Sequence, residues 1–191
     1  MSNETLTARR REIIDRARGI LESEGRDALT MRRLAEEIGI RAPSLYKHFP
    51  DKRAVEIAVI EIGFLESADA LEAGIAIDDA RSPLQRLATA YRAYALAHPH
   101  LYRLMTEDEL PRNRLTPGIE ERGAEPLIRL VPNVDRARAI WAFAHGMIIL
   151  ELEGRFPPGA DLDAAWEVGI TALGNERPSP TAVGEGKTVR D

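Results

Sequence analysis

Basic and hydroxyl side chains gather in the first third of the chain, just after a glycine. They are Arg41, Ser44, Tyr46, Lys47, His48 and Lys52. Arginine and lysine neutralise phosphates or donate to guanine, and serine and tyrosine hydroxyls bond to phosphates or to base edges. Side chains of these types at this density are typical of a surface that contacts a nucleic-acid duplex.

Two short helices must position these side chains. Leu34, Ala35 and Ile38 share one face of a predicted helix, while charged residues such as Arg32 face outward. Gly39 can end this helix, because glycine reaches the left-handed backbone region without a side-chain penalty. Pro43 suits the opening turn of a second helix, which begins near residue 42. Residues 30–49 therefore predict a helix-turn-helix whose second helix enters the major groove.

The residues nearest the start of the second helix reach deepest into the groove. We therefore assign Arg41, Ala42, Ser44 and Lys47 to base edges, with the methyl of Ala42 against a thymine methyl. Tyr46, His48 and Lys52 are assigned to the DNA backbone. The full predicted DNA-binding set is Arg32, Arg41, Ala42, Pro43, Ser44, Tyr46, Lys47, His48 and Lys52. The alternative, a helical hairpin with a solvated basic face, requires the glycine, proline, apolar and basic positions to coincide by accident.

The run from Leu29 to Val55 resembles the TetR family of transcriptional regulators. The matching positions are Leu34, Ala35, Gly39, Ile40, Ser44, Leu45, Tyr46, His48, Phe49, Lys52 and, conservatively, Val55. The resemblance implies a three-helix DNA-binding domain with the Lys52 amine and the Tyr46 hydroxyl on phosphates. It also implies that a helical ligand-binding and dimerisation domain follows.

Charge is divided unevenly along the chain. Residues 1–53 hold 12 Arg and Lys against 9 Asp and Glu, a net of +3, whereas residues 54–191 hold 14 against 22, a net of −8. A basic end on an acidic body lets one surface face the phosphates and orients its approach. The acidic remainder is interpreted as a solubilising surface.

Length and composition bound the remaining possibilities. A chain of 191 residues with 44% hydrophobic content can bury a core, and the lack of cysteine excludes a disulfide frame or thiolate metal ligands. We find no signal-peptide run and no segment long and apolar enough to span a bilayer. We expect a cytoplasmic protein with no membrane partner.

Capping and periodicity predict an all-α chain. Thr7 can cap a first helix that Gly25 ends, and Asp51 can cap a fourth. Ser82 and Gln85 form a capping box before a helix at residues 83–97. Further helices are predicted at 119–130, from Asp135 onward and at 161–173, and the apolar run 140–152 is predicted to be buried on all sides.

These elements predict three regions. We expect a helix-turn-helix DNA-binding domain at 1–53, a helical regulatory and dimerisation domain at 54–174, and a disordered tail at 175–191, which is rich in Pro, Gly and charge.

The regulatory region resembles the TetR C-terminal type named for its Trp-His-Gly motif, through residues 91–105 and Trp141, His145 and Gly146. Large side chains with polar tips suit a small-molecule site. The predicted pocket residues are Tyr91, Tyr94, Tyr102, Met105, Trp141, Phe143, His145 and Met147. About half of such residues are expected to be plain core. For His145 a satisfied core histidine, bonded to a carbonyl or a carboxylate, is favoured over a ligand contact.

A dimer face is predicted on the last two helices. Its residues are Ile149, Leu152, Leu162, Trp166, Gly169 and Leu173. Spacing alone fits packing on the same chain equally well, and a two-fold reading of DNA favours the dimer.

Metal and catalytic sites are not supported. His98, His100 and the acids at 107–109 match no known ligand spacing, so we expect neither a metal nor another cofactor. There is no glycine-rich phosphate loop, nucleophile elbow or HExxH.

The sequence therefore predicts a homodimeric transcriptional repressor that binds a double-stranded DNA operator and responds to a small molecule. One alternative is an architectural or cell-division factor regulated by a protein partner. Another, ranked last, is an enzyme or carrier with a vestigial helix-turn-helix.

Overall fold

The computed structural model describes residues 3–175, which contain helices and connecting turns and no strand. The helices are α1 (Asn3–Glu24), α2 (Met31–Ile38), α3 (Ala42–Tyr46), α4 (Lys52–Ile75), α5 (Pro83–Ala97), α6 (Pro99–Thr106), α7 (Ile119–Leu130), α8 (Val134–Leu152) and α9 (Leu162–Gly174), with a 3-10 turn η1 at Arg112–Arg114. The predicted all-α class is confirmed. The predicted tail, apart from Asn175, lies outside the described residues.

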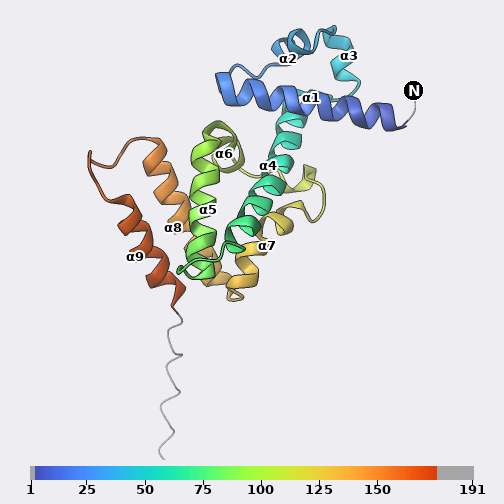
Figure 1. Cartoon of the computed structure of the whole chain (residues 1–191). Coiled ribbons are helices and arrows are strands. Elements are labelled where there is room, and N and C mark those ends of the chain that lie inside the picture. The colour runs from blue at the N-terminus through green and yellow to red at the C-terminus, as the bar shows by residue number, and fades with distance from the viewer. Residues whose placement is uncertain (1–2, 176–191) are drawn as a thin grey trace, which may run out of the picture.

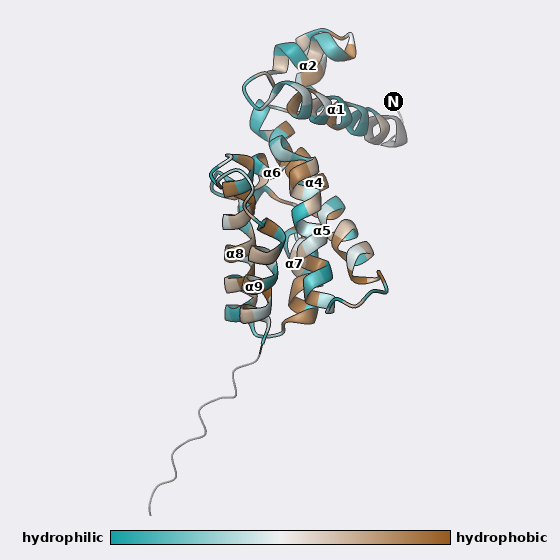
Figure 2. Ribbon diagram, turned by 60° about the vertical axis from the view of Figure 1, so that its left-hand side comes forward, coloured by the Kyte–Doolittle hydropathy of each residue, from teal (hydrophilic) through white to brown (hydrophobic). Residues whose placement is uncertain are grey.

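The first three helices lie together at one end of the molecule, and α4 runs from them into the body formed by α5 to α9 (Figure 1). The coloured part of α1 is mostly hydrophilic, whereas α4 has strongly hydrophobic stretches (Figure 2). α4 packs against α1, α5, α6 and α7. It is therefore the element that connects the two ends.

Local capping explains several helix boundaries. Ser82 Oγ accepts from the Gln85 N–H at 3.2 Å and Gln85 Oε1 accepts from the Ser82 N–H at 2.8 Å, which confirms the predicted capping box. Asp51 caps α4 by accepting from the Ala54 N–H at 2.6 Å, also as predicted. α5 and α7 have the predicted bounds.

Two boundary expectations were wrong. α1 begins at Asn3, so Thr7 lies inside the helix instead of capping it. α8 begins before Asp135, because the side chain of Asn133 accepts from the Arg136 N–H at 2.9 Å and caps it first. Pro99 marks a true break, because α5 ends at Ala97 and a new helix, α6, begins at Pro99, where a missing amide hydrogen has no helical partner to lose.

Buried side chains form two clusters. The first joins α1 to α4 with Tyr94, Leu101 and Leu104 of α5 and α6. The second joins α5, α6, α8 and α9, and includes Ile148 and Trp166. The first cluster therefore continues from α2 and α3 into the body.

The expectation that residues 140–152 are buried on all sides was wrong for the single chain. Trp141 is 50% exposed and Leu150 is 40% exposed. The residues that face inward on α8 include Ile140, Ala144 and Ile148. None of the helices within residues 3–175 is both long and apolar enough to cross a membrane.

Candidate functional site

The turn between α2 and α3 has the geometry of a helix-turn-helix. Gly39 lies in the left-handed region with a φ of 72°, and its N–H donates to the carbonyl oxygens of Ala35 and Glu36. A Cβ at this position would meet no heavy atom within 4 Å beyond its chain neighbours, so backbone conformation, and not space, favours glycine. Leu45 on α3 is fully buried and holds the second helix against the core.

The predicted DNA-binding residues all lie between α2 and the start of α4, on the helices and on the two connecting turns, at one end of the molecule (Figure 1). Most are exposed: Arg32, Arg41, Pro43, Ser44, Tyr46 and Lys47. Ala42, His48 and Lys52 are half-buried. Cations and hydroxyls on this surface are therefore accessible to a phosphate backbone.

Two of the predicted cations already have partners on the chain. The Arg32 guanidinium lies 3.4 Å from the Glu36 carboxylate, and both side chains are mostly exposed. The Lys52 amine donates to the carbonyl oxygen of Arg26 at 2.9 Å and lies 3.7 Å from the Glu56 carboxylate. The Lys52 amine is thus held by the Arg26 carbonyl oxygen and the Glu56 carboxylate, while part of the side chain remains exposed to solvent.

Arg10 makes a contact that sequence reasoning missed. Its guanidinium lies 4.2 Å from the ring centroid of Phe49 and donates to the carbonyl oxygen of His48. It therefore ties α1 to the turn that follows α3, the recognition helix predicted to enter the groove. The residues are far apart in sequence, and no local pattern pairs them.

Four of the predicted pocket side chains form one hydrogen-bonded chain across α5, α6 and α8. Trp141 Nε1 donates to Tyr91 Oη at 3.2 Å, Tyr91 Oη lies 3.2 Å from Tyr102 Oη, and Tyr102 Oη lies 2.8 Å from His145 Nδ1. Burial raises the pKa of Tyr91 and Tyr102 and lowers the pKa of His145, so all four groups are uncharged near neutral pH.

The structure does not bring all the predicted pocket residues together. Phe143 packs edge-on against Trp166, and Met147 lies in the same cluster as Tyr102. Tyr94 and Met105 belong instead to the cluster shared with α1 and α4. His145 has a hydroxyl partner, where a carbonyl or carboxylate was considered.

The outer faces of α8 and α9 have small and apolar side chains at helical spacing. We call Ala139, Ala142, Leu150, Ala165, Val168 and Ala172 the α8–α9 stripe; all six are exposed. Val168 is 70% exposed. α8 and α9 pack side by side (Figure 1), so the two halves of the stripe belong to neighbouring helices.

The residues predicted for a dimer face lie closer to the core than this stripe. Trp166 is buried and donates to Glu151 at 2.7 Å. A Cβ at Gly169 would lie 2.0 Å from Phe143 Cζ, so this glycine allows close approach within the same chain. Ile149, Leu152, Leu162, Gly169 and Leu173 are half-buried. Their part in a dimer stays a prediction.

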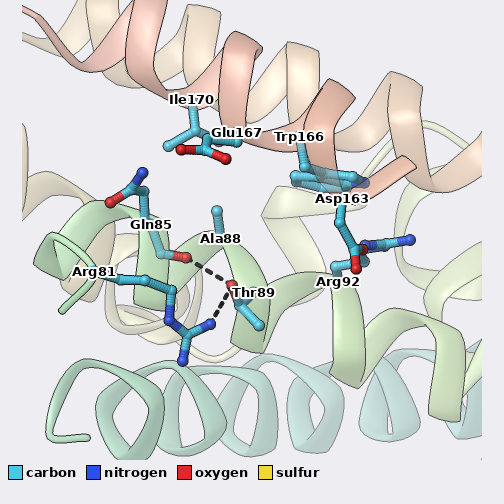
Figure 3. A pocket seen from close by; sticks show the side chains of 9 residues that line it. All are labelled: Arg81, Gln85, Ala88, Thr89, Arg92, Asp163, Trp166, Glu167 and Ile170. Carbon is cyan, nitrogen blue, oxygen red and sulfur yellow. Dashed lines mark hydrogen bonds and ion pairs between the residues drawn. The ribbon is translucent and has the colours of Figure 1, made fainter. Parts of the chain in front are cut away.

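A cleft of about 330 Å³ lies between α5 and α9 (Figure 3). Ala88, Trp166 and Ile170 are its buried apolar lining, and Arg92 and Asp163 are paired at its edge. None of the predicted pocket residues lines it.

Two family models match the chain. Residues 13–59 match "Bacterial regulatory proteins, tetR family", and residues 84–173 match "Tetracyclin repressor-like, C-terminal domain". The first match covers the helix-turn-helix and the second covers the helical body.

Curated relatives agree with these matches. An uncharacterized HTH-type transcriptional regulator of Mycobacterium tuberculosis is 34% identical over 158 residues, which cover 76% of this chain and 71% of that protein. The nucleoid occlusion factor SlmA of Vibrio campbellii is 32% identical over 125 residues, covering 60% of this chain and 63% of that factor. The second match thus spans less than two thirds of the relative.

Solved structures share the fold. A Rhodococcus sp. RHA1 protein of unknown function superposes with a TM-score of 0.67 at 31% identity, covering 86% of this chain and 93% of that chain. A TetR variant from Acinetobacter baumannii AYE in complex with minocycline superposes with a TM-score of 0.59 at 25% identity, covering 91% and 94%. The recognition motif, the helical body and these matches together show that the chain belongs to the TetR family and is a DNA-binding transcriptional regulator.

Proposed function

We propose that this regulator is a ligand-responsive repressor that acts in the cytoplasm and binds a palindromic operator as a homodimer. The observation that carries the proposal is the uncovered α8–α9 stripe on the helical body, away from the exposed helix α3 at the other end of the molecule (Figure 1). Two copies joined through such a stripe present two recognition helices related by a two-fold axis. A two-fold reader requires an operator with matching symmetry.

The effector site is proposed to surround the hydrogen-bonded chain of Tyr91, Tyr102, Trp141 and His145. Rings with polar tips suit a small molecule that has an apolar body and a few hydrogen-bonding groups. The minocycline complex of the Acinetobacter baumannii relative supports effector binding in a body of this fold. Repression is released if the effector favours a dimer whose recognition helices no longer match half-sites about 34–36 Å apart, or a multiple of that distance.

The proposal is tested by selecting bound duplexes from a random pool with the full-length protein. We expect the recovered sites to be palindromic, and light scattering to give two protomers per duplex or a pair of dimers. Recovered sites without internal symmetry would contradict the dimeric reader.

A second candidate function is favoured by the match to SlmA. In this case the protein is a DNA-binding architectural or cell-division factor that responds to a protein partner and not to a small molecule. The two candidates differ in whether small molecules change DNA binding. Displacement of the protein from a selected duplex by a small molecule supports the repressor, whereas DNA binding unmoved by metabolites supports the second candidate.

A further inference from the structure

Glu56 is a buried carboxylate in the first turns of α4, with only 3% of the residue exposed. An isolated buried charge is costly, so its partners define what it does. It accepts from Arg26 Nε at 3.0 Å and Nη2 at 3.3 Å, and from Arg53 Nη1 at 3.1 Å. Burial alone would raise the pKa of Glu56, but these hydrogen bonds outweigh burial and leave the pKa below its ordinary value. Glu56 is therefore ionised at neutral pH.

The same carboxylate faces the amine of Lys52, one helical turn earlier, at 3.7 Å. Lys52 also donates to the backbone carbonyl of Arg26. The Lys52 side chain nevertheless remains 37% exposed. The amine is thus held by two acceptors on the chain while part of the side chain stays accessible to a phosphate oxygen.

Arg26 extends this arrangement to the regulatory body. While Nε and Nη2 face Glu56, Nη1 donates to Asp108, which follows α6. Arg53 reaches the same segment, because its Nη2 donates to the carbonyl oxygen of Glu109 at 3.4 Å. Three cations, Arg26, Lys52 and Arg53, face the two carboxylates of Glu56 and Asp108, which leaves one positive charge in excess.

We propose that Glu56 is a positioning residue for DNA binding, which holds the Lys52 amine toward the phosphate backbone and joins it, through Arg26, to the segment after α6. The proposal rests on the DNA-binding function already assigned. A lysine without this anchor samples many rotamers and loses conformational entropy when it binds a phosphate. Movement of residues 108–109 changes the hydrogen bonds between Arg26 and Glu56, and so changes the position of the Lys52 amine.

The test measures the affinity of full-length variants for a fluorescein-labelled duplex recovered by selection with the wild-type protein, by fluorescence anisotropy over a series of salt concentrations. Glu56→Gln keeps the shape and removes the charge. We expect it to weaken binding roughly five- to tenfold. The slope of log affinity against log salt should fall by about 0.9, as it does when one phosphate contact is lost. A substitution that only lowers the folded fraction would leave that slope unchanged.

A double-variant cycle separates positioning from general damage. If Glu56 acts through Lys52, the variant with both Glu56→Gln and Lys52→Ala binds no more weakly than Lys52→Ala alone. Losses that add, or tighter binding by Glu56→Gln, overturn the proposal. Failure of the wild type to retain any duplex would instead overturn the DNA-binding function on which it rests.

Glu72→Gln is the matched control. Glu72 lies on the same helix and is also paired with an arginine of the body, since Arg129 Nη2 donates to it at 2.7 Å. It lies near the other end of α4. We expect this variant to bind DNA like the wild type. If Glu56→Gln does not fold, as judged by circular dichroism, Arg26→Met replaces it in the cycle. This change removes a half-exposed partner and lets Glu56 draw the Lys52 amine inward, with the same non-additive loss expected.

Discussion

Lys47 and Tyr46 are adjacent and exposed, yet we expect them to read different parts of a duplex. Lys47→Ala should lower affinity for the selected operator more than for a scrambled duplex, by about 1–3 kcal/mol, because a base-edge contact carries sequence information. Tyr46→Ala should weaken both duplexes equally, since a phosphate contact does not distinguish sequences. Competition binding with the two duplexes measures the difference. Equal losses for Lys47→Ala would remove it from base reading.

The chain of rings in the body has a direction. The indole of Trp141 can only donate, so Tyr91 accepts from it and has its own hydrogen free for Tyr102. Tyr102 can then donate to Nδ1 only if His145 is neutral. A protonated His145 would instead donate to Tyr102, and the hydrogen of Tyr102 itself would then lose its acceptor. The arrangement therefore agrees with the lowered pKa of His145.

Acid should destabilise the protein through this histidine. Burial lowers the pKa of His145 below its ordinary value of 6.5, so the unfolded chain takes up the proton at a higher pH than the folded protein. The contribution of neutral His145 to the free energy of unfolding is complete above pH 6.5. It falls as the pH drops from 6.5 toward the lower pKa that His145 has in the folded protein. We expect the urea midpoint of the wild type to fall more between about pH 7.5 and 5.5 than that of His145→Gln. Equal shifts in the two proteins would contradict this assignment.

Sequence reasoning predicted single residues for a DNA surface, which stay a prediction, and it missed the buried contacts beneath them. The identities of Ser44, Tyr46 and Lys47 are local and follow from a short motif. Glu56 had a visible signal, because it is an acid between Val55 and Ala58 in an apolar stripe and lies one turn after Lys52. Asp108, the second carboxylate that Arg26 contacts, had none, since that contact depends on how α6 packs against α1.

At the level of elements, the helices that local chemistry specifies were predicted well. The capping box and proline of α5, and the bounds of α7, need no tertiary information. The exposure of α8 could not be predicted, because a run that is apolar on nearly every face is buried in one assembly and half-exposed in another. An uncovered apolar face in a single chain is thus evidence about the assembly.

The α2–α3 turn offers a test of backbone conformation alone. Gly39→Ala places a side chain at a φ of 72° with no steric neighbour, so the expected cost is about 1 kcal/mol of unfolding free energy from the left-handed conformation. DNA affinity should fall too, because α3 is oriented by this turn.

Gly19→Ala is the matched control for that change. Gly19 lies within α1, where a Cβ also meets no atom within 4 Å. Because alanine favours a helix interior over glycine, we expect this variant to gain up to about 1 kcal/mol. If backbone conformation decides the effect, thermal unfolding will show a loss of stability for Gly39→Ala and a gain for Gly19→Ala. A loss in both would point to space instead.

At the scale of the whole molecule, the predicted domain boundary between residues 53 and 54 is only approximate, because α4 crosses it. The helix begins at Lys52, and Val55, Val59 and Ile60 belong to the same buried cluster as α1 and α2. The division into regions stays a prediction about function, since the basic end and the acidic body share one core. The proposed coupling between DNA and effector then needs no separate hinge, because any tilt of α4 moves both ends of the molecule.

The assembly is tested by placing a charge on the α8–α9 stripe. Val168→Glu should convert the proposed dimer to a monomer, since burying an unpaired carboxylate in an interface costs several kcal/mol. The monomer should remain folded, because Val168 is 70% exposed on the single chain. Light scattering gives the mass. DNA affinity should fall steeply, because one protomer contacts only one half-site.

Leu96→Glu is the control for that variant. Leu96 on α5 is also an exposed apolar residue, 38% accessible, and lies outside the stripe. If exposed apolar residues in general drive association, both variants will be monomeric; if the stripe is the interface, only Val168→Glu will be. A Val168→Glu protein that keeps the dimeric mass and the wild-type affinity would place the interface elsewhere. The half-buried residues predicted from spacing, such as Leu162 and Leu173, would then be the next positions to change.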